Sequence, residues 1–387
     1  MIIQILVLIL FLAIFFGLQI YVSRQLKNLF EIEKKRYVYV PVISLTVGSI
    51  LFIVLMNITL NMFVYIIYRL LSLWMGIFLF LVCYLAVFHI INGVLILFKN
   101  RRLPERIRIP DHVSIPKKIA GITVVILTVL TSIYGVWNAY DHDVEHVYLE
   151  FENLNGTVDI AVLSDIHIGS GGRSGFLEEL VKKTNSLDPD IVLIPGDIVD
   201  SNGFLTDDMF SPLKDLKADS YFVTGNHEVM IDGEKMIEIL KRNGVRVLDN
   251  EVVKTHGIQL VGLRYMSADG NGNEFIAPEE NQTIKSVMPS LNISDDSPAI
   301  LMHHDPVGIS YVQEAGIDLY IAGHTHGGQL FPITFIAESL TSDYFKGIYH
   351  YEDMDVYVSQ GSGFWFIPMR VGTDSEITMM HLRGNTY

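Results

Sequence analysis

The sequence predicts an N-terminal region of four transmembrane helices followed by an α/β domain of layered sheets with outer helices. Three observations lead to this prediction. Half of the 387 residues are apolar, and the apolar excess is concentrated in residues 1–140. Those residues carry a formal charge of +9, whereas residues 141–387 carry −24. In the acidic part, short apolar runs alternate with helical patterns, which is typical of an α/β domain.

Four segments of the first 140 residues have the length and composition of membrane spans. A helix needs about 20 apolar residues to cross the bilayer core, and each segment meets or approaches that length without Asp, Glu, Lys or Arg. Only Arg69 separates the second span from the third, which predicts a tight turn there. The first span lacks a basic start and a small-residue cleavage site, so we interpret it as an uncleaved helix. The four segments are residues 2–22, 42–68, 70–98 and 119–137.

The loops between these spans predict their orientation. Five Lys or Arg residues lie between the first two spans, and seven lie between the last two. Short basic loops face the cytoplasm in membrane proteins. An even number of spans then places the N-terminus and everything after Trp137 outside. We therefore expect a multi-pass protein of the cell membrane, with a transmembrane region in residues 1–140 and an extracytoplasmic domain in residues 141–387.

The charge and cysteine content of the outer domain exclude some partners and sites. A domain with a formal charge of −24 lacks the basic face that nucleic acids require. The one cysteine of the chain, Cys83, lies in the third predicted span. The outer domain therefore has neither disulfides nor thiol ligands, and a metal bound there must use nitrogen and oxygen donors. Such donors suit Mn, Fe or Zn better than copper(I).

Apolar strands and helices alternate along the outer domain. The runs "VDIAVL", "DIVLIP", "SYFV", "AILM" and "DLYIA" are short and continuously apolar, which predicts strands buried on both faces. Residues 175–186 and 234–243 have helical spacing, and the second helix is expected to end at Gly244. Further strands are expected near "VRVLDN" and "IQLVGL" and in residues 349–382.

Each of the five apolar runs is followed by side chains that bind metals or transfer protons. Because open α/β sheets bind ligands at the carboxyl ends of their strands, we expect these side chains to converge. Burying carboxylates and imidazoles together is unfavourable, and divalent cations would remove that penalty. One such Asp could be a helix cap and one such His a core residue, but the whole set in order is hard to explain that way. The residues are Asp165 and His167, Asp197 and Asp200, Asn226 and His227, His303 and His304, and His324 and His326.

Five ordered blocks in this set resemble the calcineurin-like metallophosphoesterase family. The blocks are D-x-H, G-D-x-x-D, G-N-H-E, H-x-P and G-H-x-H, and five in order are far more specific than one motif. The stretches "LDPDIVLIPGDIVD", "NGVRVLDNEVV" and "GHTHGGQL" are similar to the membrane-attached or exported bacterial and archaeal branch of this family. The resemblance covers roughly residues 147–383 and implies a four-layer α/β/β/α sandwich.

The resemblance also implies roles for individual residues. His304 rather than His303 is the expected ligand, because it lies two residues before Pro306, and His303 would be a neighbour. His227 would protonate the leaving group or stabilise developing charge, with Asp200 orienting it. One metal would be held by Asp165, His167, Asp197 and His326, and a second by Asp197, Asn226, His304 and His324, with Asp197 bridging.

We expect a metal-dependent hydrolase that activates a bridging water for in-line attack on a phosphomonoester, phosphodiester or pyrophosphate. Two divalent ions and two ligand carboxylates leave the pocket at about +2 within an acidic domain, so anions are attracted only there. The membrane anchor favours a lipid-linked or cell-envelope substrate. Residues 361–366, with three aromatic side chains, would form a lipid-accepting groove, packed core or a membrane-facing surface.

Two alternatives are compatible with the same sequence. The spans could tether a phosphoesterase for soluble nucleotide-type substrates, which a substrate panel with and without micelles would distinguish. Alternatively, the protein could be a metal-binding membrane sensor. The pair Asp200 and His227 argues against the sensor, because a sensor needs no proton donor.

Overall fold

The computed structural model describes residues 2–56, 62–100, 115–169, 174–200, 204–270, 282–340 and 343–384. The chain divides into two compact units, Met1–Gly135 and Val136–Tyr387. Each unit has its own hydrophobic core. The first is helical, and the second contains all of the strands that the structure describes.

The first unit consists of long apolar helices. Among the residues that the structure describes, two helices are long and apolar enough to cross a membrane, Phe63–Leu97 and Lys117–Tyr140. The sequence predicts four such spans, and two of them meet this criterion in the part of the chain that the structure describes. Most of the predicted basic loop between the last two spans, residues 101–114, lies outside the described residues. The helices are α1 (Ile2–Leu29), α2 (Arg36–Met56), α3 (Met62–Asn100) and α4 (Lys117–Tyr140), and α4 ends in the second unit.

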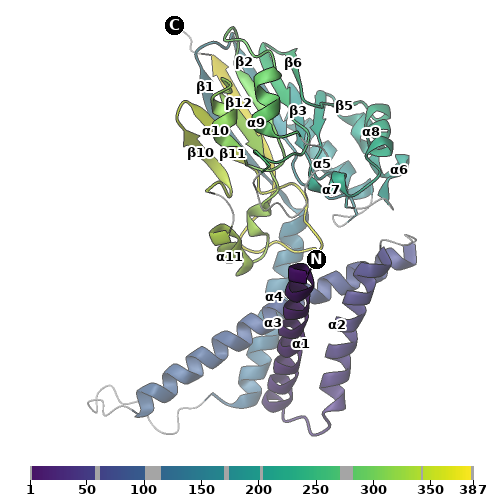
Figure 1. The fold of residues 1–387 in the computed structure, drawn as a ribbon. Coiled ribbons are helices and arrows are strands. Elements are labelled where there is room, and N and C mark those ends of the chain that lie inside the picture. Colours follow the sequence, from purple (N-terminus) through teal and green to yellow (C-terminus); the bar gives the residue numbers. More distant parts are fainter. Residues whose placement is uncertain are drawn as a thin grey trace. The chain divides into compact units, whose positions relative to one another are not determined.

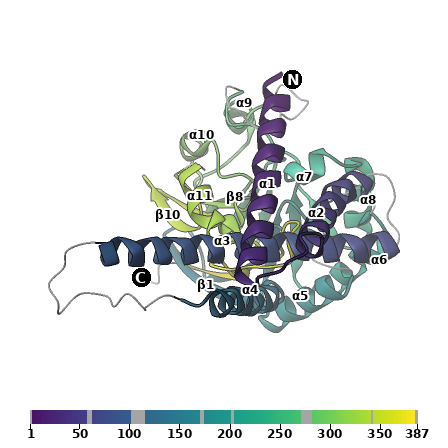
Figure 2. The same ribbon diagram turned by 90° about the horizontal axis from the view of Figure 1, so that it is seen from below.

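The tight turn predicted at Arg69 is wrong. Helix α3 runs without interruption from Met62 to Asn100 (Figure 2), and the hydroxyl of Ser72 donates to the Arg69 carbonyl within it at 3.1 Å. Arg is a good helix former, and the flanking sequence "IIYRLLS" has no Gly or Pro to end a helix. Among the described residues, α2 ends at Met56 and α3 begins at Met62.

Two six-stranded mixed sheets form the second unit (Figure 1). The first sheet has the order β1-β12-β2-β3-β4-β5 and the second the order β10-β11-β9-β8-β7-β6. These sheets confirm the predicted α/β class. The strands are β1 (His142–Phe151), β2 (Thr157–Val162), β3 (Ile191–Pro195), β4 (Asp219–Val223), β5 (Val245–Val247), β6 (Glu251–Thr255), β7 (Ile258–Gly262), β8 (Ala299–Met302), β9 (Leu319–Ala322), β10 (Gly347–Tyr351), β11 (Met354–Val358) and β12 (Ser375–Gly384).

The two sheets pack face to face. One core cluster combines Val162 and Leu193 of the first sheet with Ile300 and Ile321 of the second. A further cluster joins the other face of the second sheet to α9 and α10, for example through Tyr320. The remaining helices flank the strands. The helices of this unit are α5 (Ser174–Ser186), α6 (Asp207–Phe210), α7 (Asn226–Val229), α8 (Gly233–Arg242), α9 (Ile284–Val287), α10 (Ile309–Gln313) and α11 (Ile333–Leu340).

The strand directions bring the polar loops to one edge of the sandwich. Strands β2, β3 and β4 run parallel in the first sheet, and β8 and β9 run parallel in the second. All residues of β3, β8 and β9 are buried, as expected for strands covered on both faces. The loop after β2 meets the loop after β9, where the His324 amide donates to the Asp165 carboxylate at 3.0 Å.

A loop before β12 closes over this edge through close backbone contact. The Gly363 amide donates to the Asp165 carbonyl at 3.0 Å. A Cβ atom on Gly363 would lie 2.6 Å from the carbonyl carbon of Ile166 and 2.7 Å from the oxygen of Asp165. Real Cβ atoms do not approach backbone so closely, so any side chain here would displace the segment that carries Asp165.

We predict that Gly363→Ala lowers the free energy of unfolding by roughly 1–3 kcal/mol, the usual range for overpacking. The control is Gly175→Ala in α5, where a Cβ atom would meet nothing within 4 Å and Ala favours the helix. The measurement is the thermal unfolding midpoint of the detergent-solubilised chain. Equal midpoints for the two variants would contradict the close contact.

Candidate metal centre

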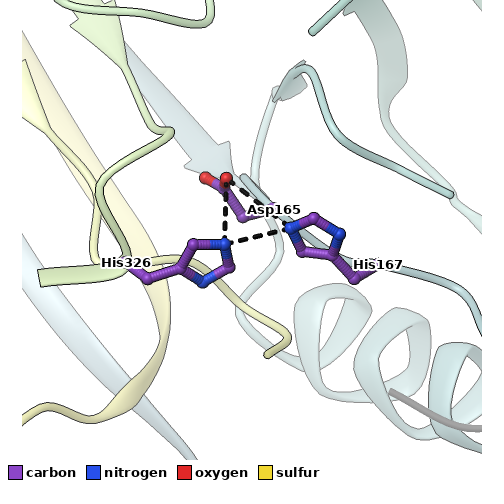
Figure 3. Close-up of side chains that lie close together, drawn as sticks. All are labelled: Asp165, His167 and His326. Atoms are coloured by element: carbon purple, nitrogen blue, oxygen red, sulfur yellow. Dashed lines mark hydrogen bonds and ion pairs between the residues drawn. The ribbon is translucent and has the colours of Figure 1, made fainter. Parts of the chain in front are cut away.

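All seven predicted metal ligands lie in the segments that directly follow β2, β3, β4, β8 and β9, and Asn226 is the first residue of α7. Asp165, His167 and His326 form one group, whose ligand atoms all lie within 4.8 Å of one another. The Nε2 atoms of the two histidines are 3.0 Å apart, and that of His326 lies 3.5 Å from Oδ1 of Asp165 (Figure 3). The first two residues follow β2 and the third follows β9, so both sheets contribute.

A second group consists of Asp197, His304 and His324, again with ligand atoms within 4.8 Å of one another. Asn226 lies in the same place, because its Oδ1 atom is 2.9 Å from Nε2 of His304 and 2.9 Å from Nδ1 of His324. The structure therefore brings together the four side chains that the sequence predicts around a second metal.

The carboxylate of Asp197 lies between the two groups. Its Oδ2 atom is 3.1 Å from Nε2 of His304 and 3.8 Å from Nε2 of His167. Asp197 also belongs to a third possible ligand group, with His167 and His227. One carboxylate oxygen is thus near imidazoles of both groups, which is the position required of a bridging ligand.

Five of the predicted ligands have left-handed backbone conformations. The φ angles are 52° for Asp165, 50° for His167, 50° for Asp197, 73° for His324 and 50° for His326. Residues other than Gly rarely adopt positive φ, and holding one there costs on the order of 1–3 kcal/mol when the surrounding structure enforces it. Such strain is concentrated at functional sites. The backbone turns sharply after each strand and directs these side chains inward.

Glycines beside the ligands allow the loops to approach one another. Gly196 has a φ of +92°, and a Cβ atom there would lie 2.7 Å from Nδ1 of His304. A Cβ atom on Gly225 would lie 2.7 Å from the Asp197 amide nitrogen. The glycines of G-D-x-x-D and G-N-H-E are therefore required by the backbone and by the space around the ligands.

Hydrogen bonds orient two of the imidazoles toward the centre. Nδ1 of His304 donates to the Pro195 carbonyl at 2.8 Å, and Nδ1 of His167 donates to Asp200 at 2.7 Å. Each bond holds a proton on Nδ1, so the proton that the ring loses on binding a cation is the one on Nε2, which faces the other ligands. A histidine held in this way by a carbonyl or carboxylate is the usual arrangement of a metal ligand.

The predicted pairing of Asp200 with His227 takes a different form. Oδ1 of Asp200 lies 3.7 Å from Nδ1 of His227, farther than its hydrogen bond to His167. Nδ1 of His227 is buried and has no hydrogen-bond partner among the described residues. Spacing in the sequence places the carboxylate near both rings but does not decide which ring it orients. Here Asp200 orients His167.

His303 points away from the centre, as a neighbour rather than a ligand. Its Nδ1 atom is 2.7 Å from the Asp305 carbonyl and 3.1 Å from the Tyr320 hydroxyl. Nε2 accepts from the Met266 amide at 3.3 Å. Burial lowers the pKa of His303 to about 4, so the ring is neutral. Both ring nitrogens are engaged outside the metal centre.

Glu228 holds two ligand-bearing loops together, a role that the sequence does not predict. Its buried carboxylate accepts the amide hydrogens of Asp197 at 2.8 Å, Ile198 at 3.0 Å and Gly225 at 2.6 Å. These bonds tie the loop after β3 to the loop after β4. Burial, together with the charge of Asp197, raises the pKa of Glu228 to about 7. The only sequence signal for this role is that Glu228 is the final residue of the G-N-H-E block.

Arg370 is a second supporting residue that no motif indicates. It is completely buried. Its guanidinium donates to the carbonyls of Gln360 at 2.6 Å and Gly363 at 2.7 Å, and to the carbonyl of His326 at 3.3 Å. It therefore holds the loop before β12 against the turn that carries a predicted ligand.

The charges around Asp197 explain the pKa shifts of the carboxylate and imidazole groups in the site. Burial alone would raise the pKa of Asp197, but the imidazoles of His304, His227 and His167 hold it well below its usual range. Burial would lower the pKa of His304, but Asp197 raises it to about 10. The pKa of His167 is likewise raised to about 9, against its burial, chiefly by Asp200. Without a cation, protons compensate the buried carboxylates.

The donor set fits divalent cations. Two fully buried carboxylates, Asp165 and Asp197, lie among imidazole nitrogens and one amide oxygen. Three such atoms, from Asn226, His304 and His324, converge at 2.9–3.2 Å. A cation would satisfy all of these lone pairs together, whereas protons can satisfy only some of them. Nitrogen and oxygen donors in this number suit Mn, Fe or Zn.

Comparison with known proteins identifies the family. The family model described as calcineurin-like phosphoesterase matches residues 158–328. A zebrafish (Danio rerio) relative named "Transmembrane protein with metallophosphoesterase domain" is 32% identical, over 80% of this chain and 72% of its own length. The chain belongs to the calcineurin-like metallophosphoesterase family. A metallophosphoesterase of Campylobacter jejuni is 31% identical, over 69% of this chain and 70% of its own length.

The match to some metallophosphoesterases is partial. A relative from Helicobacter pylori is 33% identical over 61% of this chain, and the match spans 62% of the relative's length. The family's metal-binding character agrees with the Asp and His groups of this metallophosphoesterase. The number and identity of its metals, and its substrate, are matters of proposal.

We predict that metal affinity rises with pH between pH 6 and 8. Because the pKa values of metal-free His167 and His304 are raised to about 9 and 10, both rings are protonated in this range and must lose protons to bind a cation. Apparent affinity should increase by up to about tenfold per pH unit for each proton displaced. Titration calorimetry with Mn²⁺ in two buffers of different ionisation enthalpy measures this release. Affinity independent of pH would contradict the assignment of these ligands.

We also predict that Glu228→Gln weakens metal binding and lowers the free energy of unfolding by roughly 1–3 kcal/mol. The amide would present hydrogens to backbone amides that now donate to the carboxylate, and this leaves buried donors unpaired. Glu238→Gln, at an exposed position of α8, is the control. Metal titration and thermal unfolding of both variants test the prediction, which fails if they behave alike.

Proposed function

We propose that this metallophosphoesterase hydrolyses phosphoesters with a dinuclear divalent metal centre. The observation that carries the proposal is the placement of Asp197 between two ligand groups, with His227 beside it. Asp165, His167 and His326 would complete one metal site, and Asn226, His304 and His324 the other. When bound, two divalent ions would neutralise phosphoryl charge and lower the pKa of a water molecule.

The protein's own groups suit the remaining requirements of the reaction. His227 lies at the border of the site, with 13% of its side chain exposed and its Nε2 atom 3.9 Å from Oδ2 of Asp197. Burial lowers its pKa, so the ring is neutral and one nitrogen carries a hydrogen. That hydrogen can be donated to a phosphoryl or leaving-group oxygen. A negatively charged substrate would raise the pKa of His227 on binding and favour this role.

We propose further that the chain is a multi-pass membrane protein with four spans and an extracytoplasmic catalytic domain. Its support is the two helices that meet the criterion for spans, the basic loops of the sequence, and the name of the zebrafish relative. A catalytic domain held at a membrane favours a lipid-linked or envelope phosphomonoester, phosphodiester or pyrophosphate. A substrate panel with and without micelles would distinguish this substrate class from soluble nucleotides.

We predict that His227→Ala reduces kcat by roughly 10²–10⁴ and leaves metal content unchanged, because His227 donates a proton without binding metal. The measurement is hydrolysis of chromogenic phosphomonoesters and phosphodiesters, combined with metal analysis. His350→Ala, at a side chain that is 77% exposed, is the control and should keep full activity. Unchanged turnover in His227→Ala would remove the assigned role.

We predict that Asp197→Asn abolishes metal-dependent hydrolysis, because both ligand groups lose their shared carboxylate. Asp215→Asn, at an exposed position, should retain activity. The assay is the same, with added Mn²⁺ varied over a wide range. Full activity of Asp197→Asn at saturating Mn²⁺ would contradict the bridging role.

A further inference from the structure

A cavity of about 270 Å³ opens beside the candidate metal centre. It lies between the turn of His324 and His326, the first turn of α11 and the loop before β12. Its volume is below the range of about 300–1,000 Å³ that is typical of complete ligand sites. A cavity of this size would hold part of a ligand whose other part reaches the metal centre. Its lining includes His324, His326, Leu330, Ile333, Trp365 and Ile367.

Two polar side chains that line the cavity, those of Gln329 and Thr325, are already engaged. Nε2 of Gln329 donates to the carbonyls of Trp365 and Ile367 at 3.2 and 2.9 Å, and its Oε1 accepts from the Trp365 amide at 2.8 Å. The hydroxyl of Thr325 donates to the Phe345 carbonyl at 2.6 Å. Recognition of a nucleobase or a sugar would require these groups to be available. The cavity instead presents apolar side chains such as Leu330 and Ile333.

Exposed apolar side chains surround the cavity opening. We call them the α11 surface, and they are unusual for a surface in water because four of them lie within residues 331–336 and Trp365 lines the same cavity as Ile333. The rings of Phe331 and Phe335 are in edge contact at 5.5 Å. The surface consists of Phe331 (47% exposed), Ile333 (40%), Phe335 (65%), Ile336 (56%) and Trp365 (55%).

The end of α4 and the start of α11 are held by the same loop. Nδ2 of Asn138, in the last turn of α4, donates to the Thr373 carbonyl at 2.9 Å and to the Arg370 carbonyl at 3.3 Å. In the same loop, the Val371 carbonyl accepts from the Phe331 amide at 2.7 Å. These contacts all lie within the second unit.

Helix α4 connects the second unit, which carries the α11 surface, to the proposed membrane spans. It is one of the two helices that could span a bilayer, and near its end Trp137 is 60% exposed. Trp at the end of a span lies at the interface between lipid and water. A surface that shares a loop with this end of α4 lies close to the same interface. Its apolar side chains would then contact lipid rather than water.

We propose that the cavity binds the hydrocarbon chain of a lipid phosphoester, next to the phosphate, and that the α11 surface holds its opening at the bilayer. The phosphate would lie at the metal centre and the first part of the chain against Ile333 and Trp365. This inference rests on the proposed hydrolase function and names its substrate class. It assigns Ile333 and Trp365 as residues that determine specificity.

The test compares two esters that differ only in chain length, hydrolysed by the full-length protein in mixed micelles with Mn²⁺. The pair is methyl and hexadecyl 4-nitrophenyl phosphate, or methyl and hexadecyl phosphate if the enzyme cleaves monoesters. Each methylene that enters the cavity contributes about 0.8 kcal/mol, so two of them raise kcat/KM by about tenfold or more. We expect at least this preference for the long chain.

Variants at the cavity separate its role from that of the metal centre. Ile333→Asn should reduce kcat/KM for the hexadecyl ester by about tenfold and leave the methyl ester, whose chain is too short to reach Ile333, unchanged. Ile333→Trp, which fills the cavity and keeps the apolar surface, should have the same selective effect. The matched control is Ile348→Asn on β10, which is 41% exposed and does not line the cavity. It should not change either rate.

The possible results distinguish the two proposals. Equal rates on both esters, or equal effects of Ile333→Asn and Ile348→Asn, would overturn the chain-binding role and leave the hydrolase intact. Absence of metal-dependent hydrolysis of every ester by the wild-type protein would overturn the proposed function, and this inference with it.

Discussion

The structure of the site depends on one constraint, the burial of two carboxylates among imidazoles. Asp165 and Asp197 are at most 2% exposed, and an ion without compensation is unfavourable in such a place. Neighbouring histidines with raised pKa values supply that compensation when no cation is bound. Three features keep this arrangement together. They are the left-handed backbone of five predicted ligands, the glycines that let the loops meet, and the hydrogen bonds that Glu228 accepts and Arg370 donates. Strain and burial lower the stability of the fold, and the same two features hold the ligands in place for a cation.

Much of the fold, and the convergence of the predicted ligands at one edge, follow from the sequence, because both depend on local patterns. Continuous apolar runs such as "IVLIP" become strands buried on both faces, and parallel strands must present their carboxyl ends at one edge. Ligands next to those ends therefore converge without further information. The break between α2 and α3 was placed wrongly at Arg69, because an uninterrupted apolar stretch contains no signal for where one helix ends.

Other features of the site could not be predicted, since they depend on contacts between distant segments. Asp200 lies near both His167 and His227, and only the packing of the side chains decides that it hydrogen-bonds to His167. Glu228 belongs to the G-N-H-E motif, but its role follows only from the backbone amides that donate to its carboxylate. Arg370 and Asn138 belong to no motif. Arg370 donates to the carbonyl of His326, 44 residues away along the chain, and Asn138 to that of Thr373, 235 residues away. No local pattern records such contacts.

The central claim is that a pair of divalent cations takes the place of the protons in this site. Metal analysis of the purified full-length protein by mass spectrometry, after incubation with Mn²⁺ and removal of excess ions, tests it most directly. The account predicts two tightly bound ions per chain. A chain that retains no metal while correctly folded, or only a single ion at saturation, would contradict it.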